Sequence, residues 1–390
     1  MSDKWIFIIV FLLIGIGLIF SYSLPIYLES KHHWGEYHFF IRFLLFAVVG
    51  IGIMYVLAQC NPDKCISIIG WGLLIGAGIL IVLMPTPILS PIVPVIKGAR
   101  RWIELGFFRV SPIEFFKIGM IYFFAWSFSR KLIPKKFTSV KEEIKILLPY
   151  LVILGILAFV LIIYQSDLGQ AMLLFILFAI MILFTKVSAK TFSFLIMSGV
   201  IVFIIGISQK TYRMDRFKTS LYSIYLSLPQ NVQNWFDVKI SSNDISYQIR
   251  QSLNAIHNGG FNGVGIGNGV VKLGFLSDVH TDFVLAGIAE ETGFIGVFLV
   301  MILLLALIWR ILRIANRIET KTHQDYVYVL FCIGVAMLIG VETILNALGI
   351  IGFFPLKGLP VPFVSYGGSA MMSFSIAVGM VLMISKKAKM

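Results

Sequence analysis

Three carboxylates lie in or beside one apolar stretch of the chain, HTDFVLAGIAEETGFIGVFLVMILLLALIW, residues 280–309. Asp282 lies where a polar loop enters this stretch, and Glu290 and Glu291 follow within it. A carboxylate in hydrocarbon is costly, so one that is present commonly has a function. Asp282 could accept a proton as a general base at the membrane surface. Alternatively, it only stabilises the helix, because the dipole of a helix N-terminus favours an acid.

Glu290 and Glu291 cannot share one partner, because adjacent helical residues point about 100° apart. Glu290 lies roughly 12 Å beyond Asp282 along the helix axis, at about 1.5 Å per residue. At that depth each carboxylate needs a partner inside a helix bundle or a water-filled cavity. We therefore expect structural or gating roles for both.

Cationic side chains gather in KGARRWIELGFFRVSPIEFFKIG, residues 97–119. Arginine suits phosphate because its planar fork donates two parallel hydrogen bonds. Arg101 is therefore a candidate anion ligand. Glu114 and Lys117 are three residues apart at the start of a span, so they share a helix face. The alternative is a local ion pair with arginines that reach toward lipid headgroups.

Glycines crowd residues 259–269 of SYQIRQSLNAIHNGGFNGVGIGNGVVKLGFLSDVHTDF, residues 246–283. Their spacing matches neither the dinucleotide fingerprint nor the Walker loop. We therefore predict close backbone packing in a tight turn. Arg250, Lys272, His257 and His280 could contact an anionic headgroup, although a single histidine is more often a structural residue.

Two further segments are predicted to be structural. FPLKGLPVPFVSYGGSA, residues 354–370, has prolines and glycines at membrane depth, which are tolerated only where protein or a cavity surrounds the backbone. We expect a re-entrant loop that contains Ser365, Gly367 and Gly368. YQSDLGQA, residues 164–171, is expected to be a short turn between two spans, with Asp167 as its cap.

The composition defines the class of protein. The 390 residues are 58% hydrophobic with a mean hydropathy of +0.93, which favours one polytopic membrane domain over residues 1–390. The net charge of +13 does not indicate nucleic-acid binding, because the basic residues are scattered between apolar segments. Three cysteines are too few for a disulfide framework. The N-terminal segment lacks a small-residue cleavage site, so we expect an uncleaved first span.

The apolar stretches predict an all-α protein with about ten transmembrane helices. The expected spans are residues 4–22, 40–59, 65–84, 113–129, 146–163, 170–186, 190–207, 282–309, 326–348 and 369–385.

The orientation of the spans follows from lysine and arginine in the short loops, which favour the cytoplasm. Loops 130–145 and 310–321 and the C-terminal tail are the most basic, so we place them and both termini inside. The large loop at about 208–281 then lies outside. We expect short interfacial helices in the outer loops, and no internal repeat supports an inverted-repeat transporter.

Taken together, four motifs in one order resemble the SEDS family (shape, elongation, division and sporulation), the FtsW/RodA/SpoVE family. They are GARRWIELG…SPIEFFK, YQSDLGQA, YQIRQSLNAIHNGGFNGVGIGNGVVKLGFL…HTDF…AEETG and LPVPFVSYGGSA. The resemblance runs from the first span to the last. The glycine-rich stretch resembles the division branch more than the elongation branch.

The resemblance implies a peptidoglycan glycosyltransferase that polymerises lipid II on the outer face of the bacterial cytoplasmic membrane, at the division septum. The family's essential aspartate falls on Asp282, and its RRW motif and helix-start lysine fall on Arg101, Trp102 and Lys117. We expect Asp282 to be the base, and the other side chains to bind substrate and the departing pyrophosphate. The complete predicted substrate-binding set is Arg101, Trp102, Glu114, Lys117, Arg216, Arg250, Lys272 and His280.

The expected partners are lipid II, a class B penicillin-binding protein, other division proteins and the membrane. The sequence does not identify a cofactor, and a divalent cation is the one candidate. Two other functions remain open, namely a lipid II flippase and a non-catalytic division scaffold. A role in elongation is the alternative to division.

Overall fold

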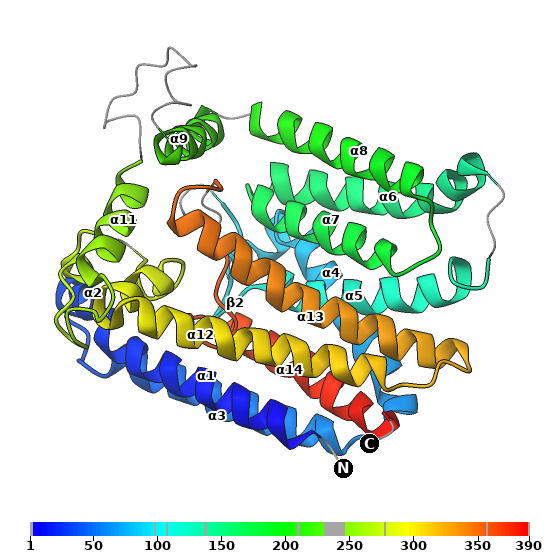
Figure 1. Cartoon of the computed structure of the whole chain (residues 1–390), viewed down its shortest axis with the longest axis horizontal. Helices are drawn as coiled ribbons and strands as arrows, with labels where there is room; N and C mark the ends of the chain where they lie inside the picture. The colour runs from blue at the N-terminus through cyan, green and yellow to red at the C-terminus, as the bar shows by residue number, and fades with distance from the viewer. Residues whose placement is uncertain are drawn as a thin grey trace.

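The computed structural model describes residues 3–96, 99–106, 108–135, 139–208, 211–229, 246–276, 278–355 and 358–388. All ten predicted spans are helices (Figure 1). They are α1 (Lys4–Ser23), α3 (His38–Gln59), α4 (Pro62–Leu83), α5 (Pro112–Lys131), α6 (Val140–Ile163), α7 (Leu168–Leu183), α8 (Ala189–Ser208), α12 (Val284–Asn316), α13 (His323–Ile350) and α14 (Gly368–Ile384).

Eight of these helices are long and apolar enough to cross a membrane, within the part of the chain that the structure describes. The other two are α7, which has 16 residues, and α5, which carries charged side chains. The chain is thus an integral membrane protein of the predicted all-α polytopic class. Local sequence signals begin several helices: Asn61 caps α4 ahead of a proline, and Thr322 and Asp325 form a capping box at α13.

Smaller elements lie between the spans. Helices α9 (Thr211–Ser227) and α11 (Tyr247–Gly259) and the 3₁₀ turn η3 (Val271–Leu273) confirm that loop 208–281 contains short helices. Helix α2 (Ile26–His32) follows α1. Two other 3₁₀ turns are η1 (Pro87–Leu89) and η4 (Ser385–Lys387). A hairpin of β1 (Ile103–Leu105) and β2 (Phe108–Val110) was not predicted; it pairs Ile103 with Val110.

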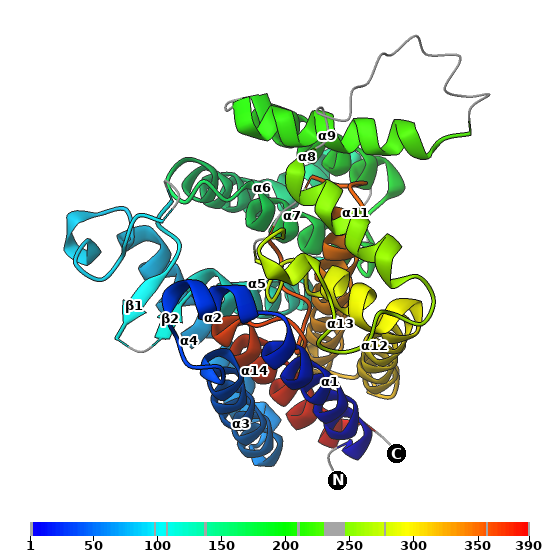
Figure 2. The ribbon, with the colours of Figure 1, turned by 90° about the vertical axis from the view of Figure 1, so that its left-hand side faces the viewer.

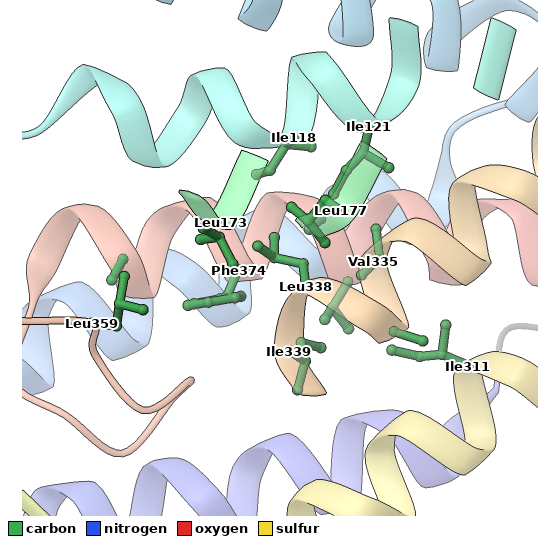
Figure 3. Packing of buried hydrophobic residues seen from close by; sticks show 14 of the residues in the cluster. Ile118, Ile121, Leu173, Leu177, Ile311, Val335, Leu338, Ile339, Leu359 and Phe374 are labelled. Carbon is green, nitrogen blue, oxygen red and sulfur yellow. The ribbon is translucent and has the colours of Figure 1, made fainter. Parts of the chain in front are cut away.

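The core is formed by α5, α13 and α14, which pack against the surrounding helices. Helix α13 packs on α5 and α12, and α14 packs on α3. Figure 3 shows aliphatic side chains of α5, α7 and α13, with Phe374 of α14, meeting between the helices. Figure 1 shows α6, α8 and α9 on one side of this core and α1 and α3 on the other.

The bundle has two distinct ends. Both chain termini lie at one end, which we call the terminal end (Figure 1). Polar contacts join segments there: Arg310 with Asp3 at 2.5 Å, and Lys387 with Asp63 at 2.6 Å. The opposite end, which we call the site end, carries α2, α11, the hairpin and the turn that contains Asp282 (Figure 2).

Helix α12 departs from a regular span. It starts at Val284, so Asp282 precedes it, and it continues to Asn316 because Ile311 and Ile314 in the basic segment are buried. Gly293 interrupts it with φ 68° and ψ −163°, a conformation available only to glycine. Thr281, which precedes this helix, donates its hydroxyl hydrogen to the carbonyl of Asp278.

Candidate functional site

Asp282 lies in a turn whose three consecutive backbone carbonyls, those of residues 280 to 282, each accept a hydrogen bond from another segment. The carbonyl of His280 accepts from the backbone N–H of Tyr366 at 2.9 Å. The carbonyl of Thr281 accepts from the hydroxyl of Ser365 at 2.7 Å, and that of Asp282 accepts from the side-chain amide of Asn346 at 2.8 Å. The turn is therefore fixed from two directions, by α13 and by the irregular segment before α14.

That irregular segment, residues 358–367, fits the predicted re-entrant loop. Val361 and Phe363 within it are buried, and the backbone N–H of Val361 donates to the hydroxyl of Ser365 at 2.8 Å. Gly367 precedes the first turn of α14, and Gly368 lies so close to the ring of Phe46 that a Cβ would be 2.5 Å from it. Side chains supply partners for part of this non-helical backbone, since the carbonyl of Leu359 accepts from Asn346 and the N–H of Val361 donates to Ser365.

The carboxylate of Asp282 borders a small pocket of about 10 Å³, close to the least space that holds one water molecule. Gly358 forms one wall: a Cβ there would lie 2.9 Å from Oδ2 of Asp282. Its φ of +55° also favours glycine. The residues that line the pocket are Asp282, Leu345, Asn346, Gly349, Ile350, Gly358 and Leu359.

His280 is placed as a packing residue. Its ring centroid lies 4.9 Å from that of Phe39 and 5.5 Å from that of Tyr366. Burial lowers the pKa of His280 to about 4, because a charged imidazole would lose its hydration there. The ring is therefore neutral at pH 7 and supplies no positive charge to an anionic substrate.

Lys117 of α5 lies in a buried ion-pair cluster and has 1% of its side chain exposed. Its ammonium group contacts the carboxylates of Glu114, at 2.8 Å, and of Glu342 on α13. Gln170 of α7 donates to Glu114 at 3.1 Å. The cluster joins three helices. The predicted contact of Lys117 and Glu114 with substrate does not fit this geometry, because the ammonium group is already held by two carboxylates.

Arg101 also makes intramolecular contacts. Its guanidinium donates to the carbonyls of Gln165 at 2.9 Å and Ser166 at 2.7 Å, and lies 3.5 Å from the carboxylate of Asp167. Asp167 caps α7 by accepting from the backbone of Gln170 at 3.1 Å, as the turn assignment predicted. The side chain of Arg101 remains 33% exposed, so it can still reach an anion. Trp102 beside it is half-buried.

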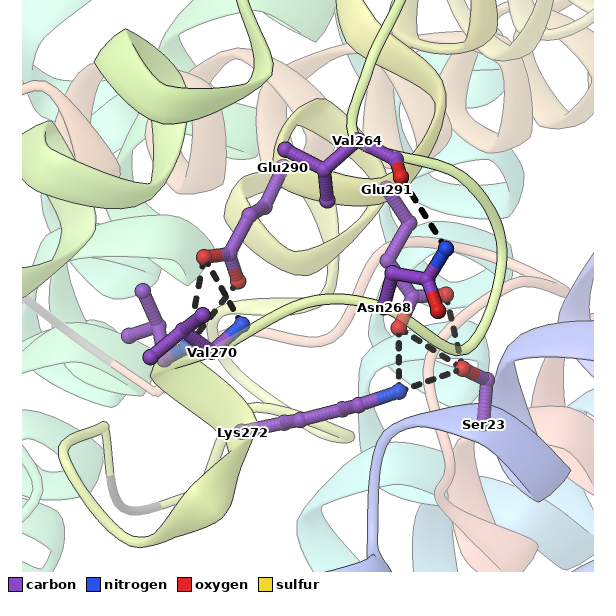
Figure 4. A network of polar contacts seen from close by, with 8 residues as sticks. Ser23, Val264, Asn268, Val270, Lys272, Glu290 and Glu291 are labelled. Atoms are coloured by element: carbon purple, nitrogen blue, oxygen red, sulfur yellow. Dashed lines mark hydrogen bonds and ion pairs between the residues drawn. The ribbon is translucent and has the colours of Figure 1, made fainter.

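Glu290 and Glu291 have separate partners, as their angular spacing predicted (Figure 4). Glu290 accepts from the backbone N–H groups of Val270 and Val271 at 3.0 to 3.2 Å. Glu291 accepts from Lys272 at 2.6 Å and from Ser23 at 2.7 Å. Lys272 is therefore a buried structural partner of Glu291, and its predicted role in substrate binding does not fit.

The glycine-rich loop packs its backbone against the interrupted part of α12, which confirms the prediction of close packing. A Cβ at Gly259 would lie 1.8 Å from the carbonyl oxygen of Ala289, and one at Gly263 would lie 2.3 Å from that of Glu291. The backbone N–H of Gly265 donates to the Glu291 carbonyl at 2.9 Å. The loop thus supplies donors where the helix is interrupted.

The two remaining predicted cations lie on the short helices. Arg216 is exposed on α9. Arg250 is half-buried on α11, 5.9 Å from the ring of Tyr247. Neither residue lines the pocket beside Asp282.

Sequence reasoning missed two members of the site, Glu342 and Asn346. Both lie on α13, four residues apart and hence on one helix face. A charged side chain inside an apolar span is itself a signal of function, so Glu342 could have been noticed. Asn346 carries no such signal, because its importance depends on a contact with residues 282 and 359.

Metal ligands do not cluster in the described ranges, where no group of three or more His, Cys, Asp or Glu side chains could hold an ion. The site that the structure offers is instead one acid beside a pocket, with buried ion pairs in the surrounding helices. This defines a polytopic helical membrane protein with a carboxylate at one end of its bundle.

The comparison with known proteins identifies the family. The FtsW/RodA/SpoVE family of cell cycle proteins matches residues 3–390, so the chain belongs to this family. The probable peptidoglycan glycosyltransferase FtsW of Helicobacter pylori strain J99 is 41% identical over 396 residues, which cover 100% of this chain and 99% of that protein. The protein of the same name from Coxiella burnetii is 30% identical and covers 98% and 96%.

Solved structures support the fold. A chain from a structure titled "Structural coordination of polymerization and crosslinking by a peptidoglycan synthase complex" superimposes with a TM-score of 0.69 at 19% identity, covering 99% of this chain and 98% of that one. The rod shape determining protein RodA of Thermus thermophilus gives 0.65 at 19% identity, covering 100% and 98%.

Proposed function

We propose that this protein is a peptidoglycan glycosyltransferase that polymerises lipid II on the outer face of the cytoplasmic membrane. Membership of the family supports this, as do the names of relatives that match over the full length. The observation that carries the proposal is the Asp282 carboxylate, which borders a small pocket while the backbone of its turn is held by Asn346, Ser365 and Tyr366.

In the proposed reaction, Asp282 is the general base. It accepts the proton of the 4-hydroxyl of the acceptor GlcNAc as that oxygen bonds to the anomeric carbon of the donor. The bond from this carbon to the pyrophosphate oxygen breaks, and undecaprenyl pyrophosphate leaves with the electron pair. Inversion at the sugar carbon needs no protein nucleophile. Asp282 belongs at the membrane surface because the reacting sugars are held there by their lipid tails.

Among the predicted phosphate ligands, we retain Arg101, with Arg216 and Arg250 as secondary candidates. Arg101 is partly exposed and carries a charge beside the membrane-embedded bundle, where it can stabilise the departing pyrophosphate. We reassign Lys117 and Lys272 to ion pairs that hold the helices together, since both are buried against carboxylates.

We further propose that both termini lie in the cytoplasm and that a class B penicillin-binding protein is the partner, with the division septum as the location. The names of the FtsW relatives favour division over elongation. A flippase would need open polar groups along a path. The contacts of Glu290 and Glu291 with loop 259–275 and α1 favour the enzyme over this alternative.

The test is polymerisation of lipid II in detergent by the purified chain with its penicillin-binding partner, with and without a divalent cation. Asp282→Asn should reduce the rate at least about 10²-fold, the lower end of what general bases contribute. Expression and partner binding should stay close to wild type, because the substitution keeps the size of the side chain and removes at most a modest interaction with the helix dipole. A wild-type rate for a folded, partner-bound Asp282→Asn protein would exclude this base.

The same preparation separates the alternatives. A flippase would move lipid II across liposomes without forming polymer, and a scaffold would do neither. Polymer from the wild-type complex, absent from the Asp282→Asn complex, would support the enzyme.

A further inference from the structure

We infer that Asn346 is a substrate-binding residue: its side-chain oxygen accepts a hydrogen bond from the 3-hydroxyl of the acceptor GlcNAc, next to the 4-hydroxyl that gives its proton to Asp282, while its amide nitrogen positions the Asp282 turn. The inference rests on the proposed function and adds a second protein group to the hydroxyl subsite. The occupant is a hydroxyl donor, either water or the sugar.

The orientation of the Asn346 amide is fixed by its partners. Its nitrogen donates to the carbonyl of Asp282 at 2.8 Å and to that of Leu359 at 2.7 Å. Both partners are acceptors, so the amide cannot be flipped without facing oxygen to oxygen. Both amide hydrogens are used in this way, and the position of Oδ1 follows from them.

Oδ1 of Asn346 is buried and has no donor among the described residues. The residue is only 6% exposed. An unsatisfied buried acceptor costs roughly 1–3 kcal/mol, so such a group normally has a partner. Asn346 and Asp282 both line the small pocket, whose other walls are mostly apolar. Two neighbouring hydroxyls of one sugar could therefore donate separately, one to the neutral oxygen of Asn346 and the other to the carboxylate of Asp282, and the first bond would hold the second proton toward the base.

The geometry also explains why asparagine suits this position. Aspartate would keep an acceptor oxygen but would lose the two amide hydrogens that bond the carbonyls of Asp282 and Leu359. Leucine would fill a similar space but has no donor and no acceptor. Thr343, one turn earlier on α13, is buried too, but its hydroxyl donates to the carbonyl of Ile339 within its own helix. Thr343→Val is therefore a matched control for loss of a buried polar group on α13.

The experiment measures how much this hydroxyl contributes to binding. In the Asp282→Asn background, binding is compared for two lipid II analogues that cannot act as donors, one with and one without the GlcNAc 3-hydroxyl. With Asn346 present, loss of the hydroxyl should weaken binding roughly fivefold to tenfold, the value of one hydrogen bond. Asn346→Leu should reduce this ratio to about one. Thr343→Val should leave the ratio unchanged.

An unchanged ratio in Asn346→Leu would overturn the inference, and an equal loss of affinity for both analogues, which leaves the ratio unchanged, would mark a purely structural clamp. If Asn346→Leu does not fold, Asn346→Ala, which also lacks the oxygen, takes its place, and an unchanged ratio there overturns the inference. Polymerisation by the wild-type complex is measured in parallel. Its absence would reject the proposed function, whereas polymerisation with an insensitive ratio rejects only the role of Asn346.

Discussion

Gly358 shows at the scale of one residue how the backbone controls the carboxylate. Gly358→Ala adds a Cβ 2.9 Å from Oδ2 of Asp282, at a φ of +55°. A displacement of about 1 Å at a reacting group can cost on the order of 10²-fold in rate, so polymerisation should fall by about that factor. The left-handed backbone adds about 1–2 kcal/mol of destabilisation.

Gly106→Ala is the control for that prediction, because Gly106 has a φ of +67° and a Cβ there meets nothing within 4 Å. It should show similar destabilisation in a thermal melt and full polymerisation. Equal activity of the two variants would mean that Gly358 does not influence the carboxylate.

His280 predicts a pH dependence of stability. Its pKa is about 4 in the folded protein, against about 6.5 when unfolded, because burial disfavours the charged ring. Acid therefore protonates the unfolded chain preferentially, and stability present above pH 6.5 is lost as the pH falls toward 4. Between pH 7.5 and pH 5 the loss should be about 2 kcal/mol.

The melting temperature of the purified protein at these two pH values tests the His280 prediction. His280→Phe keeps an aromatic ring against Phe39 and Tyr366 but cannot titrate, so its melting temperature should change less with pH. The same pH dependence in both proteins would assign the effect to other groups.

Single residues also show what could and could not be predicted from the sequence. The position of Asp282 at the start of a helix could be predicted because a polar residue adjoins an apolar run. The spacing also predicted the pairing of Lys117 with Glu114. The pairs of Lys117 with Glu342 and of Lys272 with Glu291 could not be predicted, since each joins different segments: α5 with α13, and η3 with α12. Spacing along one helix predicts only neighbours three or four residues away.

At the scale of elements, the interrupted helix α12 depends on the pair Lys272 and Glu291. Glu291→Gln leaves the Lys272 ammonium buried without a counter-charge, which should destabilise the fold by about 3–5 kcal/mol. The double variant Glu291→Gln with Lys272→Met removes the stranded charge and should recover much of the loss. Chemical unfolding in mixed micelles measures both.

Glu319→Gln is the matched control, since Glu319 pairs with the exposed Lys321 at 2.8 Å. Exposed pairs contribute about 0–1 kcal/mol, so little change is expected. If Glu291→Gln is no more harmful than this control, the pair does not hold the glycine-rich loop on α12.

The elements themselves were largely predictable, because apolar length alone defines a membrane helix. All ten spans were found, with ends displaced by up to seven residues, as at the C-terminal end of α12. The interruption at Gly293 could not be predicted, because nothing in the sequence distinguishes a glycine inside an apolar run from an ordinary helical residue. Its conformation is set by contact with loop 259–265, whose backbone bonds to the carbonyls of residues 290 and 291.

For the molecule as a whole, contacts at the ends of the bundle indicate which segments share one side of the membrane. Contacts at the terminal end link the N-terminus with α12, the start of α4 with the C-terminal tail, and the start of α13 with α5: Asp3 with Arg310, Asp63 with Lys387, and His323 with Ser129. Arg310 and Lys387 belong to basic segments that the positive-inside rule assigns to the cytoplasm. The fold therefore requires them to share one side, and the charge pattern indicates which side that is.

Cysteine labelling tests this orientation in intact cells. In a variant whose three native cysteines are replaced, Asn258→Cys on α11 should react with a membrane-impermeant maleimide, because Asn258 is exposed at the site end. Thr320→Cys, exposed in the α12–α13 loop, should react only after the membrane is permeabilised. The reverse labelling pattern would require the charges of loops 130–145 and 310–321 to lie outside the cell. That pattern would place Asp282 in the cytoplasm, away from any outer-face sugar, and the proposed polymerisation would fail with it.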